Sequence, residues 1–334
     1  MYGAYIVSRQ RWYSRRRAGR GFRYFDDDER VTDQSLLEYF ASLGIPPAWR
    51  DVQIAHNKRA RILAIGSDGA GRRQYIYHPS FRAKQEQAKF ERIVRFARAL
   101  PRMREVTETH LAHKKLDREK VLACIVRLMD EAYFRVGNDV YAREHQSYGI
   151  TTLRSKHTTV EGATIVFDFI GKSGQHQVKR ITNRRLARIV KQLDELPGYE
   201  VFKYYDEDGH LTSTSSADVN AYIKDIMGEE FTAKDFRTWG GTLIAASELL
   251  QIEPASSDRE RKKQVTACVK RVASRLGNTP AIARSSYIDP RVINSYMDGS
   301  DLRTLRTTME KMEEDEFLTR DERCVLQLLE RKDT

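Results

Sequence analysis

Short apolar runs separated by turn residues dominate the chain between about residues 26 and 95. Apolar residues at helical spacing in 31–40 predict one helix, which ends near Gly44. An Asp-Gly-Ala-Gly segment at 68–71 is typical of a hairpin turn. Strand-like runs lie before and after it, at 52–55, 61–65 and 73–78. The pattern therefore predicts a small, mainly β unit.

Helical periodicity begins near residue 84. Apolar residues recur there at helix spacing as far as Pro101, where we expect the helix to end. A second helix is expected over 118–135, with Asp117 as its N-cap and Gly137-Asn138 suited to its end. Its apolar residues share one face, as in a helix that packs on a core.

An alternating apolar pattern interrupts the helical region once. The run 165–169 predicts a strand, which turns at 171–174 and returns through 176–178. Everything beyond about residue 183 is expected to be helical. The fold class is therefore α+β, with a small mainly-β N-terminal domain and a larger mainly-α domain that carries an inserted β-hairpin. The expected parts are a flexible basic arm, the β domain and the helical domain, at 1–25, 26–95 and 96–334.

The charge balance favours a polyanionic partner. The 334 residues carry a formal net charge of +11, and each Lys or Arg that meets a phosphate releases counterions. Residues 1–25 contain seven arginines and no acidic residue, which suits a basic arm. The segment 14–17 is similar to a twin-arginine export signal, but no apolar core follows it, so export is excluded. No apolar stretch has the length of a membrane span, so no membrane partner is expected.

The three cysteines indicate neither a metal site nor a disulfide framework. Cys124, Cys268 and Cys324 are far apart, and no Cys-x-x-Cys pair exists. They are typical of small buried side chains in a reducing compartment. The sequence also contains no P-loop and no acidic metal cluster, so no cofactor and no metal are expected.

The segment 232–238 places two cations at the start of a helix. Thr232 and Asp235 resemble a capping box, which puts Lys234 and Arg237 on one face of the first turns. A helix N-terminus already favours an anion, so two cations there are unfavourable for the helix itself. A bound phosphate explains them, and a solvated surface pair is the alternative.

Two other cations have a structural and a functional interpretation. Arg135 lies at the expected end of its helix, where it either complements the helix C-terminus or donates to phosphoryl oxygens. Lys172 lies at the hairpin tip between two glycines. It is either a solvated turn lysine or a mobile acid that reaches a leaving group.

Tyr287 lies in polar company just beyond a short helix. Gly277 is expected to end one helix, while Thr279 caps the next and Pro280 suits its first position. Tyr287 follows two turns later, after the polar residues 284–286. The chain has 16 tyrosines, and most tyrosines pack with a wet hydroxyl, so packing is the alternative to chemistry here.

Four segments in this order resemble the type IB DNA topoisomerases, especially the small branch shared by poxviruses and bacteria. They are Arg-Val-Gly-Asn with a following Tyr, Gly-Lys-Ser-Gly, Lys-Asp-Phe-Arg-Thr-Trp-Gly and Ser-Ser-Tyr-Ile-Asp-Pro, at 135–141, 171–174, 234–240 and 285–290. The resemblance extends through residues 71–79 of the β unit and covers most of the chain from about residue 26. It therefore implies the bilobal fold shared with tyrosine recombinases.

The resemblance assigns a role to each of these residues. It implies that Tyr287 attacks a phosphodiester and leaves a 3′-phosphotyrosyl link with a free 5′-hydroxyl. Arg135 and Arg237 then hold the non-bridging oxygens, and Lys172 is the general acid for the 5′-oxygen. Lys234 assists or binds phosphate. The expected activity is relaxation of supercoiled duplex DNA by strand rotation and religation, without ATP, metal or other cofactor.

Asn278 is a departure from part of the family. The resemblance places a histidine of the eukaryotic and viral members at this position, just before Tyr287. Asparagine still donates a hydrogen bond to a phosphoryl oxygen, but it carries no charge. The structural interpretation of Asn278 is a helix-end residue after Gly277.

The β unit carries a second group of family positions that meet DNA. Tyr75 and Tyr77 share one face of their expected strand. DNA contact and cross-strand packing remain alternative interpretations of these two side chains. The expected DNA-binding residues here are Arg72, Arg73, Gln74, Tyr75 and Tyr77. The resemblance implies that the two domains clamp the duplex as a monomer, in the cytoplasm at a bacterial nucleoid.

Two alternatives remain open at this point. Tyrosine recombinases also use two arginines and a tyrosine, but they usually carry His-x-x-Arg where this chain has Lys234-x-x-Arg237. Their N-terminal domain is more often helical than β. The stretch after Tyr287 is long enough for a recombinase tail. A non-catalytic DNA-binding protein is the second alternative, and the presence of Tyr287 and both arginines argues against it.

Overall fold

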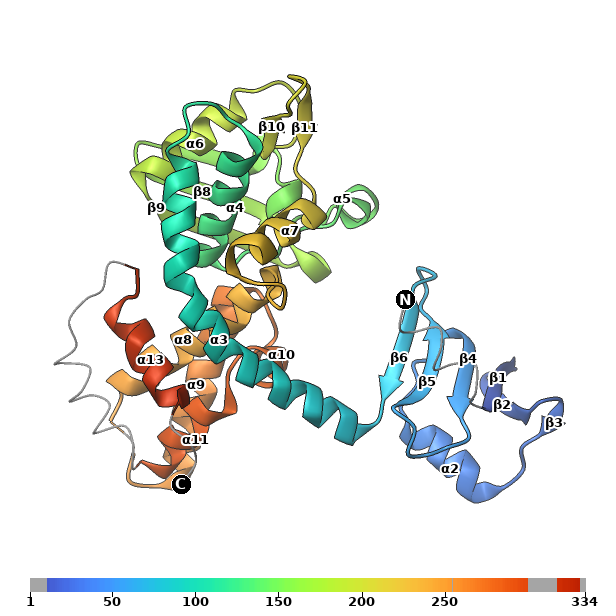
Figure 1. Cartoon of the computed structure of the whole chain (residues 1–334). Helices are drawn as coiled ribbons and strands as arrows, with labels where there is room; N and C mark the ends of the chain where they lie inside the picture. Colours follow the sequence, from blue (N-terminus) through green and yellow to red (C-terminus); the bar gives the residue numbers. More distant parts are fainter. Residues whose placement is uncertain (1–10, 254, 300–316, 331–334) are drawn as a thin grey trace. The chain divides into compact units, whose positions relative to one another are not determined.

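The computed structural model describes residues 11–253, 255–299 and 317–330, and the chain divides into two compact units (Figure 1). The first unit spans Met1–Lys89 and the second Phe90–Thr334. Each unit has its own hydrophobic core. The expected α+β fold, with a small mainly-β part before a larger mainly-α part, is confirmed. No helix of the described residues has the length and apolar character needed to cross a membrane.

In the described residues, the first unit is a six-stranded antiparallel sheet that packs against helix α2. The strand order is β3-β2-β1-β4-β5-β6. Phe40 of the helix packs with Val52, Ile54 and Ala64 of the sheet. The elements are β1 Trp12–Ala18, β2 Gly21–Asp26, β3 Glu29–Arg30, α2 Gln34–Ser42, β4 Arg50–Ala55, β5 Ile62–Ser67 and β6 Arg73–Tyr77. The predicted helix, the three strands and the turn between β5 and β6 are therefore confirmed.

The flexible arm expected over 1–25 is wrong from Trp12 onward, because β1 and β2 are interior strands of this sheet. The alternation of a strand explains how an arginine run is accommodated. Arg15 is buried and donates to the carbonyl oxygens of Pro46 and Trp49, at 3.1 and 2.9 Å. Arg16, one residue on, is exposed. Residues 1–10 of the expected arm lie outside the described residues.

Helix α3 (Pro79–Leu111) passes through Pro101, so the expected helix end there is wrong. Proline removes one backbone donor, but burial on one helix face continues on both sides of it. Leu100, Met103 and Thr107 are all completely buried. The domain boundary expected at residue 95 lies inside this helix, and the division of the chain falls between Lys89 and Phe90.

Helix α4 (Arg118–Ala132) begins as predicted, with Asp117 capping its first turn, but it ends before residue 135. Tyr133 takes the left-handed conformation and terminates the helix. Asn138 is the N-cap of the next helix, α5 (Asp139–His145), rather than part of the end of α4. Arg135 therefore lies in the loop between two helices, where it is free to turn away from α4.

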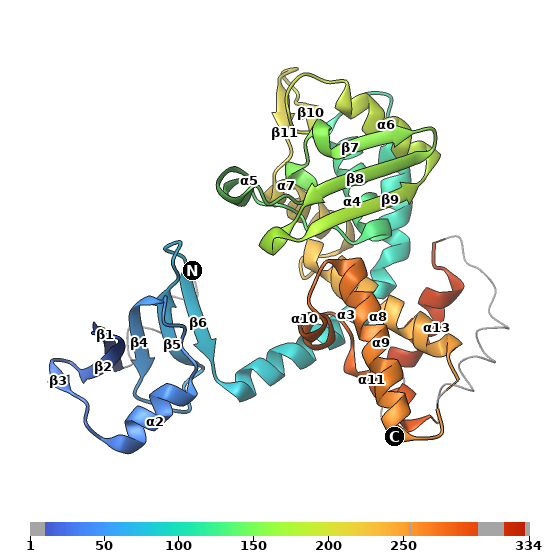
Figure 2. The ribbon, with the colours of Figure 1, turned by 180° about the vertical axis from the view of Figure 1, so that it is seen from behind.

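A three-stranded sheet, in the order β7-β8-β9, covers α4 (Figure 2). The predicted hairpin is confirmed, and a third strand precedes it. The strands are β7 Thr158–Glu161, β8 Thr164–Ile170 and β9 His176–Thr182. The 3-10 turns η1 Ile150–Thr152, η2 Ser155–His157 and η3 Lys172–Gly174 precede the sheet or join its strands. The expectation that all beyond 183 is helical is wrong at β10 Lys203–Tyr205 and β11 Leu211–Ser213, which pair.

The second unit also contains a helical layer in which α8 lies at the centre, whereas α6 packs against α4, β7 and β8. Helices α9, α11 and α13 all pack against α8. The helices are α6 Arg184–Asp194, α7 Ser216–Met227, α8 Ala233–Gln251, α9 Asp258–Leu276, α10 Pro280–Ser286, α11 Pro290–Asp298 and α13 Arg320–Glu330. As expected, the three cysteines are buried and free.

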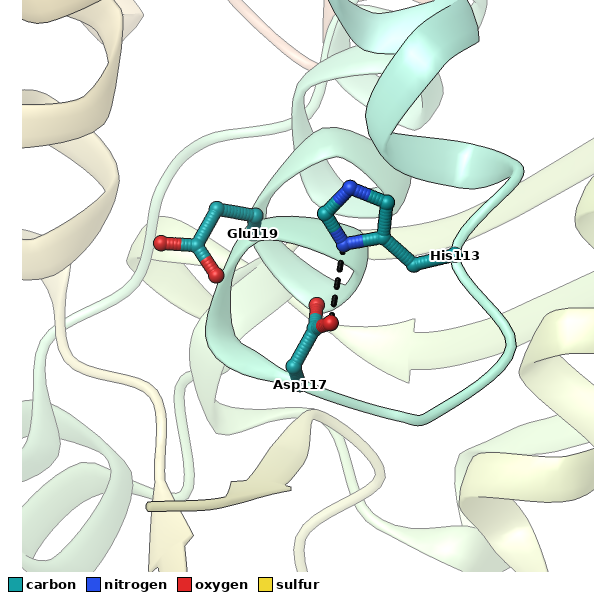
Figure 3. Close-up of side chains that lie close together, drawn as sticks. All are labelled: His113, Asp117 and Glu119. Atoms are coloured by element: carbon teal, nitrogen blue, oxygen red, sulfur yellow. Dashed lines mark hydrogen bonds and ion pairs between the residues drawn. The ribbon is translucent and has the colours of Figure 1, made fainter. Parts of the chain in front are cut away.

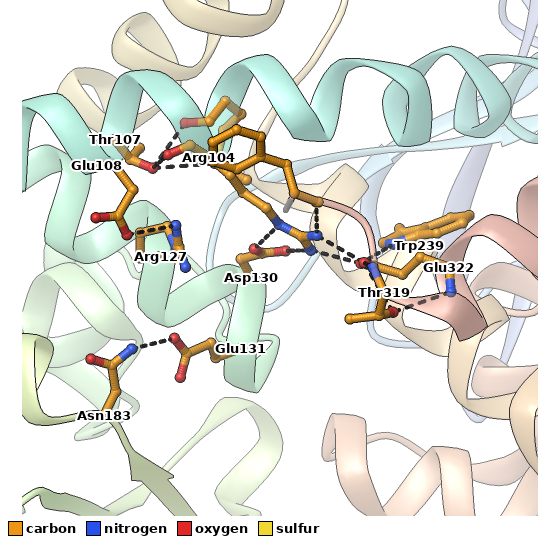
Figure 4. A network of polar contacts seen from close by, with 12 residues as sticks. Arg104, Thr107, Glu108, Arg127, Asp130, Glu131, Asn183, Trp239, Thr319 and Glu322 are labelled. Atoms are coloured by element: carbon orange, nitrogen blue, oxygen red, sulfur yellow. Dashed lines mark hydrogen bonds and ion pairs between the residues drawn. The ribbon is translucent and has the colours of Figure 1, made fainter. Parts of the chain in front are cut away.

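A buried ionic network holds the last helix in this layer (Figure 4). Arg104 of α3 donates to both carboxylate oxygens of Asp130, at 2.8 and 3.1 Å. It also donates to both oxygens of Glu322 in α13, at 2.8 and 2.6 Å. Trp239 of α8 donates to Glu322 at 3.4 Å. Four helices are thereby joined around one guanidinium.

Candidate active site

Tyr287 is held by its backbone at the end of α10. Its N–H donates to the carbonyl oxygen of Ala283 at 3.0 Å, and its carbonyl oxygen accepts from the Thr242 hydroxyl at 3.3 Å. The residue is 8% exposed. Gly241 of α8 lies so close that an added Cβ would be 2.5 Å from the Tyr287 carbonyl oxygen. Helix α8 therefore fixes the position of this tyrosine.

Arg237 is buried beside Tyr287. Its Cζ lies 5.1 Å from the centre of the tyrosine ring. Its Nη1 donates to the Tyr133 carbonyl oxygen at 2.7 Å and its Nη2 to the Leu276 carbonyl oxygen at 2.8 Å. Its Nε is buried and has no partner among the described residues. A solvated surface position, the structural alternative for Arg237, is therefore wrong.

The capping box at the start of α8 is confirmed and orients this arginine. Asp235 accepts from the backbone N–H and the hydroxyl of Thr232, at 2.9 and 3.0 Å. Its other oxygen accepts from Arg92 of α3 at 2.8 Å. Lys234, between them, is exposed. The cap and the ion pair hold the first turn of α8, from which Lys234 and Arg237 extend.

Arg135 reaches across to the end of α9. Its Nη2 donates to the Gly277 carbonyl oxygen at 3.0 Å and to Oδ1 of Asn278. Asn278 Nδ2 is buried and has no partner among the described residues. The expected helix-capping role of Arg135 is thus seen at α9, not at its own helix.

Arg135, Lys172, Lys234, Arg237 and Tyr287 line one cleft of about 330 Å³. Lys172 is exposed at the tip between β8 and β9. The described residues that line the cleft include no Asp or Glu. Four cations are therefore gathered around one tyrosine without a carboxylate, which is costly for the free protein and favourable for a bound phosphate.

The charges of the cleft, together with burial, shift the pKa values of Arg237 and Tyr287. Burial, and then Arg135, lower the pKa of Arg237 to about 10, so it stays charged at neutral pH. Burial raises the pKa of Tyr287, but Arg237, Arg135 and Lys234 outweigh it, and the pKa falls below 10.0. A tyrosine that loses its proton more easily is a better nucleophile.

The structure describes the DNA-contact candidates of the first unit at β6 and the turn before it. Arg72 and Gln74 both donate to Oδ2 of Asp68, at 2.8 and 2.9 Å. The rings of Tyr75 and Tyr77 stack with centroids 5.9 Å apart, so they share a face as predicted. Tyr75 is 39% exposed. Arg73 is exposed and, two residues before Tyr75, lies on the same strand face as the two tyrosines.

Lys179 of β9 was not among the residues singled out from the sequence. Its Nζ donates to the Arg275 carbonyl oxygen, and its neighbours include Arg237 and Arg135. The position of Lys179 in the alternating pattern of its strand could have indicated it. Lys179 lies two residues before the buried Ile181 and shares its strand face, whereas the exposed Val178 and Arg180 lie on the other.

Two clusters of the described residues have the spacing of a metal site. Figure 3 shows the first, His113, Asp117 and Glu119. Asp117 already accepts from the Lys120 N–H at 2.9 Å as a helix cap and contacts His113 Nδ1 at 2.8 Å. The second cluster, Asp206, Asp208 and His210, is a turn in which Asp206 accepts from backbone N–H groups. Local structure accounts for both clusters.

Comparisons with known proteins place this arrangement in context. Residues 78–316 match the family model of the eukaryotic DNA topoisomerase I catalytic core, and residues 21–68 match that of the bacterial DNA topoisomerase IB N-terminal domain. The chain is 34% identical to DNA topoisomerase 1B of Acanthamoeba polyphaga mimivirus, over 82% of this chain and 84% of the viral one. It is 25% identical to DNA topoisomerase 1B of vaccinia virus (strain Copenhagen), over 89% and 95%.

Proposed function

The chain belongs to the DNA topoisomerase IB family, and from this membership we propose which residues cut and rejoin the DNA strand. The protein is a type IB topoisomerase, which relaxes DNA by transient cleavage of one strand, strand rotation and religation without ATP. The family assignment sets aside the recombinase alternative.

Tyr287 is the proposed nucleophile. Its hydroxyl oxygen attacks the scissile phosphorus, the bond to the 5′-oxygen breaks, and a 3′-phosphotyrosyl ester forms. The lowered pKa of Tyr287 supports this role, because loss of the phenolic proton accompanies the attack. The phosphodiester energy is kept in the tyrosyl ester, so the 5′-hydroxyl can attack back after rotation without a nucleotide.

Arg135 and Arg237 are the proposed ligands of the non-bridging phosphate oxygens. The observation that carries the proposal is the cluster of cations around Tyr287 in a cleft whose described lining has no carboxylate. The unpartnered Nε of Arg237 is a donor available to an oxyanion, and so is Asn278 Nδ2. Donors fixed before the substrate arrives stabilise the charge that develops in the transition state.

Lys172 is the proposed general acid for the departing 5′-oxygen, with Lys234 as a further phosphate contact. Both extend into the cleft from its rim, and the hairpin position of Lys172 leaves it free to follow the leaving group. In religation the same amine accepts the proton of the attacking 5′-hydroxyl.

The first unit contributes a DNA-contact surface in this proposal. Tyr75 and Tyr77 present stacked rings on one face of β6, and Arg73 supplies a phosphate contact. Arg72 and Gln74, both tied to Asp68, form the adjoining turn. The substrate is supercoiled duplex DNA, and the protein acts as a monomer. Its place of action is the nucleoid in the cytoplasm, where free thiols persist.

Plasmid relaxation in EDTA and without ATP tests the function. We expect the purified protein to relax both positive and negative supercoils, and detergent to trap it on the 3′ end of a nicked strand. Tyr287→Phe must abolish relaxation and the adduct while DNA binding persists. Tyr199→Phe, at a tyrosine that is 80% exposed, is the matched control and keeps activity. Relaxation by Tyr287→Phe overturns the site assignment.

A further inference from the structure

The C-terminus of α9 has an unusual set of hydrogen-bond partners. A helix leaves its last carbonyl groups without partners inside the helix. The carbonyl oxygens of Ala273 and Ser274 accept from the N–H groups of Asn278 and Gly277, at 2.9 and 3.1 Å. Gly277 reaches this arrangement through a left-handed backbone, with φ of 61°. The next three carbonyl groups accept from no backbone donor within the described part of the chain.

These three carbonyl groups accept from three cations instead. Lys179 Nζ donates to the Arg275 oxygen at 2.5 Å. Arg237 Nη2 donates to the Leu276 oxygen at 2.8 Å, and Arg135 Nη2 to the Gly277 oxygen at 3.0 Å. Consecutive residues of one helix end are thus bound by side chains from β9, from α8 and from the loop after α4. The partial negative charge of a helix C-terminus favours this.

Two of these three cations are the proposed phosphate ligands, and the third stands in an environment that otherwise disfavours it. Arg237 of α8, Arg275 of α9 and Arg135 of the α4–α5 loop all face the Lys179 ammonium. Tyr133, at the end of α4, lines the same pocket, and burial raises the pKa of Tyr133 to about 12, so it is neutral. The groups that shift the pKa of Lys179 therefore include no carboxylate. The ammonium is stabilised instead by the Arg275 carbonyl oxygen of α9.

We propose that Lys179 is a positioning residue of the cleavage reaction, which holds the last turn of α9 so that its carbonyl groups orient Arg135 and Arg237 toward the phosphate. This rests on the proposed roles of the two arginines. Each arginine uses one nitrogen for α9. Arg237 uses a second one for the Tyr133 carbonyl oxygen and keeps Nε for the substrate. A shift of the last turn of α9 therefore moves both phosphate ligands together.

The position predicts a pH dependence. Burial, followed by Arg237, Arg275 and Arg135, lowers the pKa of Lys179 to about 8. Below this pH the amine is charged and holds the carbonyl firmly. Above it the charge is lost, the last turn of α9 loosens, and cleavage by free enzyme slows. A bound phosphate favours the charged form, so the alkaline fall in kcat lies at higher pH than the fall in kcat/KM.

Three variants test the proposal. Lys179→Met removes the donor, Lys179→Arg keeps a donor whose charge does not titrate, and Arg180→Met removes one charge from the exposed face of the same strand. The cleavage rate is measured in single turnover from pH 6 to 10 on DNA that cannot religate. Affinity for intact duplex is measured separately in a Tyr287→Phe background.

We expect Lys179→Met to cleave roughly 10- to 100-fold more slowly, as for displaced catalytic groups, with a Kd within about 3-fold of the parent. Lys179→Arg retains most of the rate and loses the alkaline fall of the wild-type protein. Arg180→Met behaves as wild type. Any alkaline fall that belongs to Lys172 persists in Lys179→Arg, so the two lysines are distinguished.

Two results overturn the proposal. One is a Lys179→Met protein that is folded and cleaves as fast as Arg180→Met. The other is an unchanged alkaline fall in Lys179→Arg, which decides the matter even where Lys179→Met fails to fold. A wild-type protein that forms no Tyr287 adduct is a different outcome, because it rejects the proposed function itself.

Discussion

Gly241 sets how closely α8 approaches the nucleophile, and Gly241→Ala tests whether that distance controls cleavage. The added methyl carbon would lie 2.5 Å from the Tyr287 carbonyl oxygen, 3.0 Å from its Cβ and 3.1 Å from Leu276 Cδ1. Ordinary contact begins at 3.4 Å, so the Tyr287 backbone must retreat by about 0.9 Å, the difference between 3.4 and 2.5. Backbone carbonyl groups cannot rotate away as a flexible side-chain end does.

The retreat has two consequences. It lengthens the hydrogen bond from Thr242 to the Tyr287 carbonyl oxygen, which is already 3.3 Å. It also displaces the phenol by nearly 1 Å, and a displacement of this size costs roughly 100-fold in rate. Overpacking costs about 1–3 kcal/mol of stability, partly offset by about 1 kcal/mol because alanine favours a helix more than glycine does.

The assay is the single-turnover rate of covalent adduct formation, together with affinity for uncleaved duplex. We expect the rate to fall roughly 100-fold while affinity changes by less than about 3-fold, because the cations of the cleft stay in place. Gly69→Ala is the matched control, since its added carbon meets nothing within 4 Å. A folded Gly241→Ala protein that forms the adduct at the parental rate refutes the reasoning.

Three further predictions concern the buried network and the cleft. Arg104→Ala leaves two buried carboxylates unpaired and should cost about 3–5 kcal/mol in urea unfolding, against less than about 1 kcal/mol for the exposed Arg98→Ala. Burial raises the pKa of Glu322, but Arg104 outweighs it and the pKa falls below 4.5. The ionised Glu322 therefore contributes to the free energy of unfolding above pH 4.5, and this contribution is lost below it. The difference in free energy of unfolding between the parent and Glu322→Gln should therefore shrink as the pH falls. Asn278→Asp should neutralise Arg135 and slow adduct formation at least about 10-fold, whereas Asn278→Leu with equal slowing contradicts this reason.

Local rules were sufficient for much of the fold. Asp117 and Thr279 cap the helices that their side chains indicated, and the Thr232–Asp235 box starts α8 as predicted. Period-two apolar alternation located β8 and β9. These features depend on residues close together in the chain, so the sequence reveals them directly.

The errors arose where tertiary burial outweighed local signals. Pro101 normally ends a helix, but α3 continues because Leu100 and Met103 on either side are both buried in the core. The arginines of β1 resembled a mobile arm, yet Arg15 finds three backbone acceptors inside the first unit. Neither the core that buries the residues around Pro101 nor the acceptors of Arg15 can be recognised from the neighbouring sequence.

The sequence predicted which residues form the site, but not which contacts hold them in place. The motifs brought Arg135, Arg237 and Tyr287 to attention, and the structure lines one cleft with all three. Nothing in the motifs indicated that Arg135 leaves α4 to bind the end of α9, or that Lys179 binds beside it. Those contacts join elements more than 95 residues apart, since Lys179 and Arg275 are separated by 96 positions.

The ionic network that joins α13 to the core also sets a time order during synthesis. Arg104 and Glu322 are separated by 218 positions, so the ribosome adds 218 residues after Arg104 before this pair can form. Domains fold as units as they emerge, and the layer around α8 lacks α13 until residues 320–330 have been made. A nascent chain therefore already carries Tyr287 and its arginines before the layer that fixes α8 is complete.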